Sequence, residues 1–176
     1  MRKIKKFSSI AILLVLAAAF AALFIDIKTI LIIFLTSLLF VGYVIYKEKI
    51  GQELLVAFLF AAFITSYYIY EYTTSNILLG RINLFPLISW TFSLVLLREI
   101  YERMRNKHKI ILISLFYLFV LFILEYLGFY LAGIRLNSNF PSLFGSGIIH
   151  APLPMQIFYL LAGPIYLLAT DYLRVK

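Results

Sequence analysis

The amino-acid sequence predicts an all-α protein, a polytopic membrane helix bundle with six transmembrane helices and both termini in the cytoplasm. Apolar residues make up 64% of the 176 residues and charged residues only 14%, whereas soluble domains are about half apolar and about a quarter charged. Apolar runs of membrane-spanning length recur along the chain, and the basic residues cluster between them. Because no connection is long enough to hold a soluble domain, residues 1–176 are expected to form a single integral membrane domain.

Three helices are expected in the first half of the chain. Their approximate bounds are residues 7–25, 29–46 and 52–72. Alanines in the first helix resemble a signal-peptide cleavage region, but the apolar run continues to Ile25, which favours a helix that is retained. The third helix ends in tyrosines of the kind that lie at a headgroup boundary. These are Tyr67, Tyr68, Tyr70 and Tyr72.

Three further helices are expected in the second half, and a long outer loop separates the last two. The helices are expected at about residues 83–101, 110–132 and 155–172, and the loop at 135–154. Pro86 falls in the first turn of the fourth helix, where a missing amide hydrogen costs least. Part of the charged connector Arg98–Lys109 is expected to continue the fourth helix into water.

The orientation of the bundle follows from the distribution of lysine and arginine. Thirteen of them lie on one side of the six predicted spans and three on the other. The three are Lys28, Arg81 and Arg135. Because cytoplasmic loops carry the excess of basic residues, this distribution predicts a multi-pass protein of the cell membrane with its termini inside.

Composition and missing motifs exclude several classes of function. The chain has no cysteine, so disulfides, thiolate metal sites and cysteine nucleophiles are excluded. The basic clusters alternate with predicted spans, which favours orientation signals over a nucleic-acid surface. No phosphate-binding glycine loop, metal-ligand spacing or catalytic triad pattern is present, so neither a cofactor nor a metal is expected. Membrane lipids are the expected partners, and a homo- or hetero-oligomer within the membrane is left open.

Glu125 is the leading catalytic candidate. It lies fifteen residues into the predicted fifth helix, in the outer half of the membrane, where a bare carboxylate costs several kcal/mol. Gly128 and Ala132 share its face at a spacing that allows helices to approach closely, so this face is expected to point into the bundle. Glu125 is interpreted either as a general acid, proton-coupling residue or ligand anchor, or as the partner in a structural hydrogen bond.

His150 is the second catalytic candidate. It lies in the outer loop, which is long and partly apolar and is interpreted as a lid or a shallow re-entrant segment over the bundle. An imidazole carries or passes a proton near neutral pH, and His150 is expected to approach Glu125 or Glu71. The alternative is a loop histidine that is hydrogen-bonded to the backbone.

Polar and aromatic residues at the outer end are the candidates for ligand binding. They are Glu71, Arg81, Asn83, Trp90, Arg135, Asn137, Asn139, Gln156 and Tyr159. Glu71 and Arg81 are alternatively solvated residues at the membrane boundary. Trp90 alternatively packs in the core or contacts lipid.

These features lead to three hypotheses about function. The first is binding, and acid–base modification, of a lipid or isoprenoid-like molecule in an outer-half pocket, with Glu125 as proton donor or anchor and His150 and Arg135 at the mouth. Whether the protein is an enzyme is left open. The second is a small transporter or channel subunit with Glu125 as coupling residue, although the inner halves of several helices lack the polar residues that a pore needs. The third is a non-catalytic membrane scaffold.

Overall fold

The computed structural model describes residues 2–21, 25–68, 70–73 and 76–174. This described part of the chain is mostly helical, and five of its helical segments are long and apolar enough to span a membrane. These segments are Ile27–Tyr46, Ile50–Tyr67, Leu84–Arg103, Lys109–Leu131 and Leu153–Leu173. The prediction of a helical bundle with membrane-length apolar segments is therefore confirmed.

The first two helices are α1, Arg2–Ala21, and α2, Ile27–Tyr67. Asp26 caps α2, since its carboxylate accepts hydrogen bonds from the backbone N–H groups of residues 28 and 29 (3.1 and 3.2 Å). The range of α2 contains two helical arms that meet at a kink at Tyr46, whose backbone is not helical (φ −123°, ψ 26°). The two separate helices that the sequence predicts here are therefore confirmed as the apolar segments Ile27–Tyr46 and Ile50–Tyr67.

The end of α2 differs from the prediction, because the helix stops at Tyr67 and not at Tyr72. Tyr68 is extended (φ −119°, ψ 122°), and Tyr72 pairs with Leu136 in an isolated antiparallel bridge. Tyrosine favours extended backbone, and the bridge joins this segment to the loop that follows α4. Tyr70 is consequently buried in the core, 1% exposed.

A short hairpin leads into the third helix. Its strands are β1, Leu78–Leu79, and β2, Ile82–Asn83, which pair antiparallel. Gly80 takes a positive φ of 61° between them, a conformation that glycine adopts without steric cost. The helix that follows, α3, spans Leu84–Arg103 and so extends slightly beyond the predicted bounds.

The remaining elements build the second half of the bundle. Helix α4, Lys109–Tyr126, continues directly into a short π-helix, η1, Leu127–Leu131. The loop that follows contains one turn of 3₁₀ helix, η2, Leu143–Gly145, and leads into α5, Leu153–Arg174. The predicted fifth helix thus changes its winding two residues after Glu125.

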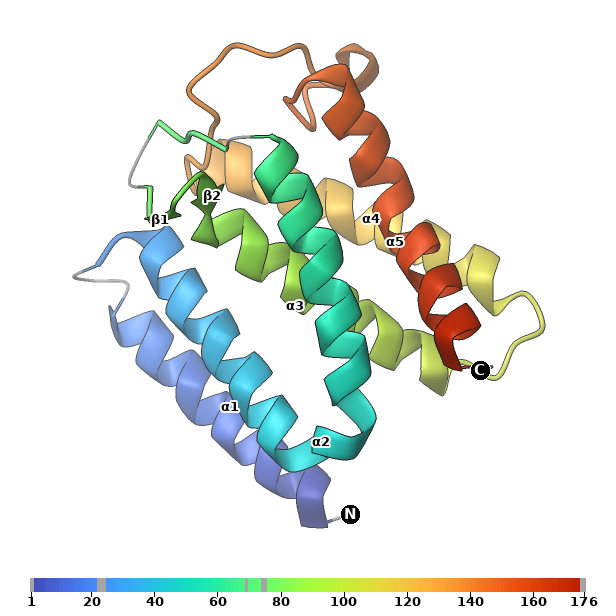
Figure 1. Cartoon of the computed structure of the whole chain (residues 1–176). Coiled ribbons are helices and arrows are strands. Elements are labelled where there is room, and N and C mark those ends of the chain that lie inside the picture. The colour runs from blue at the N-terminus through green and yellow to red at the C-terminus, as the bar shows by residue number, and fades with distance from the viewer. Residues whose placement is uncertain (1, 22–24, 69, 74–75, 175–176) are drawn as a thin grey trace.

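The loops gather at two ends of the bundle (Figure 1). The start of α1, the bend in α2, the connector between α3 and α4 and the end of α5 lie toward one end, which we call the lower end. The hairpin and the loop between η1 and α5 lie at the opposite, upper end. Helix α1 packs along the first arm of α2, and α4 crosses behind α3 and α5 (Figure 1).

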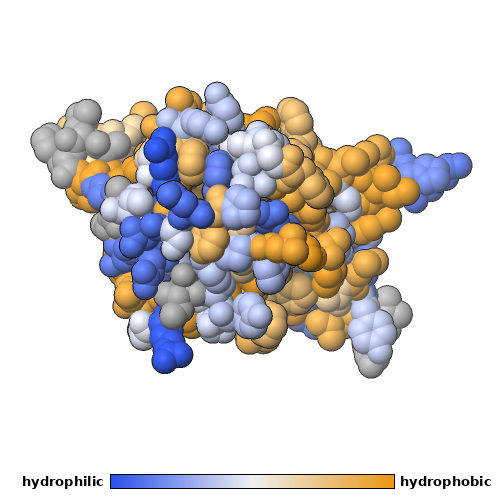
Figure 2. Space-filling view, turned by 90° about the horizontal axis from the view of Figure 1, so that it is seen from above, coloured by the Kyte–Doolittle hydropathy of each residue, from blue (hydrophilic) through white to orange (hydrophobic). Residues whose placement is uncertain are grey.

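Packing and surface both suit a chain surrounded by lipid. Where α4 packs against α5, Gly163 lies against the ring of Tyr117, and a Cβ atom there would come within 2.8 Å of the ring. Many large apolar side chains are exposed along the helices, among them Phe40, Phe63 and Phe119. Figure 2, which looks down on the upper end, shows hydrophilic residues gathered over part of that end with hydrophobic residues beside them.

Candidate functional site

Glu125 lies in the last turn of α4, toward the upper end of the bundle. It is half-buried, and its negative charge reaches four tyrosines that come from α4, from α5 and from the segment after α2. These are Tyr70, Tyr72, Tyr117 and Tyr159. Burial raises the pKa of Tyr70, and the charge of Glu125 raises it further. The carboxylate therefore lies within electrostatic range of these tyrosines.

The polar contacts of Glu125 are few. No hydrogen bond or ion pair joins its carboxylate to any residue in the described part of the chain. The π-helix begins two residues later, and its wider turns are closed by Ala132 N–H to Leu127 C=O (2.9 Å) and Ile134 N–H to Gly128 C=O (2.8 Å). Because η1 ends the helical segment, it is a π-turn of the kind found at helix C-termini. Glu125 is thus a carboxylate in a membrane-length helix with its hydrogen-bonding capacity still available.

Three of the predicted ligand-binding residues are packed around Tyr70 instead of lining a cavity. The Tyr159 hydroxyl donates to the Tyr70 hydroxyl (3.3 Å), and the Asn83 side chain donates to the Tyr70 carbonyl (2.8 Å). Asn83 also caps α3, because its Oδ1 accepts from the N–H of Phe85 (3.1 Å). The Trp90 ring lies 5.1 Å from that of Tyr159. These contacts give Asn83 and Trp90 evident structural roles.

His150 and Arg135 meet at one ring of η1. The imidazole of His150 stacks on Phe129 with ring centroids 4.1 Å apart and planes inclined by 15°. The guanidinium of Arg135 lies 4.6 Å from the centre of the same ring, and its Nε donates to the Phe129 carbonyl (3.1 Å). Burial lowers the pKa of His150, and the charge of Arg135 lowers it further. His150 therefore favours the neutral form, and no contact in the described residues joins it to Glu125.

The other predicted residues fasten the upper loops or lie exposed. The Gln156 side chain donates to the carbonyls of Pro141 (2.9 Å) and Ala151 (2.8 Å), which ties the long loop to the first turns of α5. The backbone N–H of Asn137 donates to the backbone carbonyl of Glu71 (2.7 Å). The side chains of Glu71, Arg81, Asn137 and Asn139 are exposed. The structure thus brings only part of the predicted site together: Asn83, Trp90 and Tyr159 near Tyr70, and Arg135 and His150 at Phe129.

Lys28 is an upper-end residue that sequence analysis used only for the orientation of the bundle. Its side chain is buried, 2% exposed, and its Nζ lies 4.6 Å from the centre of the Tyr72 ring. A cation over an aromatic face is stabilised by the ring quadrupole. Lys28 therefore brings a positive charge to Tyr72, one of the tyrosines within electrostatic range of Glu125.

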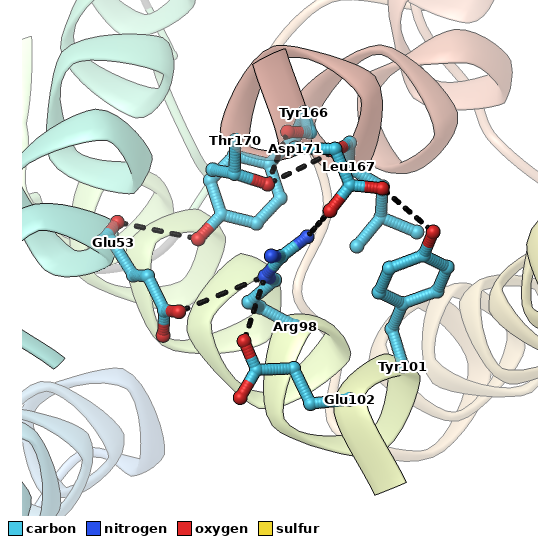
Figure 3. Close-up of polar contacts among 8 residues, drawn as sticks. All are labelled: Glu53, Arg98, Tyr101, Glu102, Tyr166, Leu167, Thr170 and Asp171. Carbon is cyan, nitrogen blue, oxygen red and sulfur yellow. Dashed lines mark hydrogen bonds and ion pairs between the residues drawn. The ribbon is translucent and has the colours of Figure 1, made fainter. Parts of the chain in front are cut away.

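A buried ion network at the lower end was missed by sequence analysis (Figure 3). Its centre is Arg98 of α3, which is 2% exposed and donates to Asp171 of α5. The Nε of Arg98 lies 3.6 Å from Glu53 of α2 and 3.3 Å from Glu102 of α3. Tyr101 donates to the second oxygen of Asp171 (2.7 Å). The network joins α2, α3 and α5 at one level.

Sequence signals for this network existed but were weak. Arg98 and Glu102 have the i, i+4 spacing of a helix ion pair, yet such pairs are common on solvated helix ends. Glu53 and Asp171 lie near the lower ends of their helices, but nothing in the sequence shows that they face each other. The expectation that Arg98 opens a solvated connector is wrong, because α3 continues to Arg103 and buries Arg98 in the bundle.

Two cavities lie away from Glu125 and from the long loop. The larger is an open groove of about 390 Å³ between the two arms of α2 and α3. It is lined by Thr36, Leu39, Phe40, Tyr43, Gly51, Leu54, Leu55, Phe58, Ile88 and Thr91. The smaller, of about 10 Å³, is lined by Gln52, Glu53, Val56, Thr170 and Leu173. Among the described residues, no group of three or more His, Asp or Glu side chains is arranged to hold a metal ion.

These features define the chain as a helical bundle with membrane-length apolar segments. The bundle has an acid near tyrosines toward its upper end and an ion network at its lower end. No protein-family model, curated protein or solved structure matches the chain.

Proposed function

We propose that this chain is a multi-pass protein of the cell membrane that binds a lipid or isoprenoid-like molecule in its outer half. We propose six membrane spans, which are α1 and the five apolar segments given above. Both termini then lie in the cytoplasm. The excess of lysine and arginine on the side that corresponds to the lower end supports this orientation. The upper end is then the outer one.

The proposal rests on one observation, the position of Glu125. A charged carboxylate at this depth is costly, so Glu125 either binds a proton or meets a polar group that the described residues do not supply. Protonated, the acid donates a hydrogen bond, and the surrounding aromatic rings favour an apolar molecule over an ion. The ligand class that satisfies both is a lipid or isoprenoid-like molecule with a hydroxyl or carbonyl group.

The groove between α2 and α3 supports the lipid character of the ligand class independently. Its lining is almost entirely apolar, and hydroxyl groups come only from Thr36, Tyr43 and Thr91. A cleft of about 300–1,000 Å³ with apolar walls is typical of small-molecule sites. No lining residue belongs to α4 or α5, so a molecule in this groove is separate from one at Glu125.

The experiment is purification in mild detergent followed by mass spectrometry of the retained lipids, for the native chain and two variants of Glu125. Glu125→Gln keeps a hydrogen-bond donor and should retain the lipid, whereas Glu125→Leu removes it. A hydrogen bond to a buried group contributes about 1–2 kcal/mol, so retention by the Leu variant should fall about tenfold. Leu124→Ala, on the exposed face of the same helix turn, is the matched control and should retain the lipid.

The opposite result would show that Glu125 has no role in lipid binding. If Glu125→Leu retains the same lipids in the same amount and is more stable in detergent than the native chain, Glu125 merely faces the membrane and the proposed site is misplaced.

A small transporter or channel subunit is the second candidate. The observation in its favour is the ion network around Arg98, because charged groups inside membrane spans often belong to ion or proton pathways. Proton or ion flux into liposomes that contain the protein, and not into empty liposomes, would favour this candidate. A chain that neither retains a lipid nor supports flux fits the third candidate, a membrane scaffold.

A further inference from the structure

The loop from Ser142 to His150 is a closed unit with an unusual backbone. Its two ends pair in an isolated antiparallel bridge. The Leu143 N–H donates to the carbonyl of Ile148 (3.0 Å), and the Gly147 N–H donates to the Ser142 hydroxyl (3.0 Å). Within the described residues, this loop contains both of the non-glycine residues with positive φ, Phe144 (50°) and Ile149 (56°).

The two residues with positive φ have opposite surroundings. Ile149 is buried, 1% exposed, and holds the loop on the bundle together with buried Leu143. Phe144 is 92% exposed. A left-handed conformation is unfavourable for any residue with a Cβ atom, and water is unfavourable for a phenyl ring. The loop therefore holds a large apolar side chain outward, against both the backbone preference and the hydrophobic effect.

Hydrogen bonds place this loop level with the ends of two membrane-length segments. Gln156, in the first turns of α5, donates to the carbonyl of Pro141, just before the loop. Tyr130, near the end of the segment Lys109–Leu131, donates from its hydroxyl to the carbonyl of Gly147 (3.1 Å). The exposed rings of Tyr126 and Tyr130 lie 4.9 Å apart at this level, as is typical of the aromatic belt at a membrane surface.

The charge pattern favours lipid over a charged protein partner. No Lys, Arg, Asp or Glu occurs in the sequence between Arg135 and Asp171. His150 favours its neutral form, because burial lowers its pKa. The loop thus presents an uncharged surface with one protruding ring beside lipid-facing helices, which is the chemistry of an interfacial membrane anchor.

We propose that Phe144 inserts into the bilayer at the boundary between head groups and acyl chains, and that it anchors the Ser142–His150 loop at that depth. The partner is the lipid surface around the upper end of the bundle. This inference requires the membrane placement of the chain and does not depend on a ligand at Glu125.

The test uses the absence of cysteine from the chain. Phe144→Cys is labelled with a dye whose emission depends on polarity, in protein reconstituted into bilayer nanodiscs. The matched control is Asn139→Cys, an exposed residue at the same end outside the closed loop. Size-exclusion chromatography and thermal unfolding of both variants verify that they are folded.

The label at position 144 is expected to emit at shorter wavelength than the label at 139. Lipids that carry a nitroxide near the glycerol backbone should quench it strongly, and aqueous iodide should quench it weakly. The reverse pattern should hold at position 139. If both labels show the same emission and the same accessibility to iodide, Phe144 lies in water and the proposal is wrong. Strong quenching only by nitroxides at the end of the acyl chain would also contradict it, because the ring would then lie too deep for an interfacial anchor.

Discussion

At the scale of single residues, side chains of one predicted site have separate roles. Asn83 caps a helix, Gln156 fastens a loop and Trp90 packs against Tyr159. Glu125 is different, because no hydrogen bond or ion pair joins it to a described neighbour. Some of the polar residues expected at the outer end thus stabilise the fold, several others lie exposed, and Glu125 is a half-buried acid whose hydrogen-bonding capacity is available to a ligand.

His150 provides a prediction about pH. Burial and Arg135 lower its pKa in the folded chain below the ordinary value. The imidazole therefore binds its proton at a higher pH in the unfolded chain than in the folded chain. The free energy of unfolding consequently decreases as the pH falls below about 6.5, and this decrease ends below the lowered pKa of the folded chain. Thermal stability in detergent, measured between pH 8 and pH 5, should fall on the acid side.

The control is His150→Phe, which keeps a ring that can stack on Phe129 and removes the titrating group. Its stability should depend less on pH across the same window. An equal acid-side loss in the variant would assign the pH dependence to other groups.

At the scale of elements, the pairing of α4 with α5 depends on the absence of one side chain. A Cβ atom at Gly163 would lie 2.8–2.9 Å from three atoms of the Tyr117 ring, and the Tyr117 hydroxyl already donates to the Tyr159 carbonyl. The ring can neither stay in place nor move without loss of that hydrogen bond. Small residues at such contacts let membrane helices approach closely.

Gly163→Ala is therefore expected to reduce stability by about 1–3 kcal/mol, the usual cost of overpacking a well-packed site. Gly128→Ala is the matched control, because no atom lies within 4 Å of the position of its added Cβ. It should leave stability unchanged or slightly higher. Thermal or denaturant unfolding in detergent measures both, and equal effects would mean that α4 and α5 are not packed at Gly163.

At the scale of the whole molecule, ion pairs connect α2, α3 and α5 at the lower end of the bundle. Arg98 contacts acids from three helices, and the side chains of Arg98 and Glu53 are each 3% exposed. Breaking a buried ion pair costs more than breaking a surface pair, because the remaining charges lose their partner in a poor solvent for ions.

Arg98→Ala is expected to reduce stability by about 3–5 kcal/mol. Arg103→Ala removes the exposed pair with Glu99 (3.4 Å) on the same helix and should cost at most about 1 kcal/mol. Unfolding in detergent compares the two variants. A cost for Arg98→Ala no larger than that of the control would show that water reaches the network and solvates its acids.

The sequence by itself determined the helical membrane class and the approximate helix positions, because both depend on the length and composition of local apolar runs. It also singled out Glu125, since a carboxylate in such a run is conspicuous. Only the tertiary structure decided that the second arm of α2 stops at Tyr67 and that Tyr70, just after it, turns into the core. The ion network of Glu53, Arg98 and Asp171 likewise depends on contacts between residues distant in sequence. Periodicity along one helix does not specify which face of another helix packs against it.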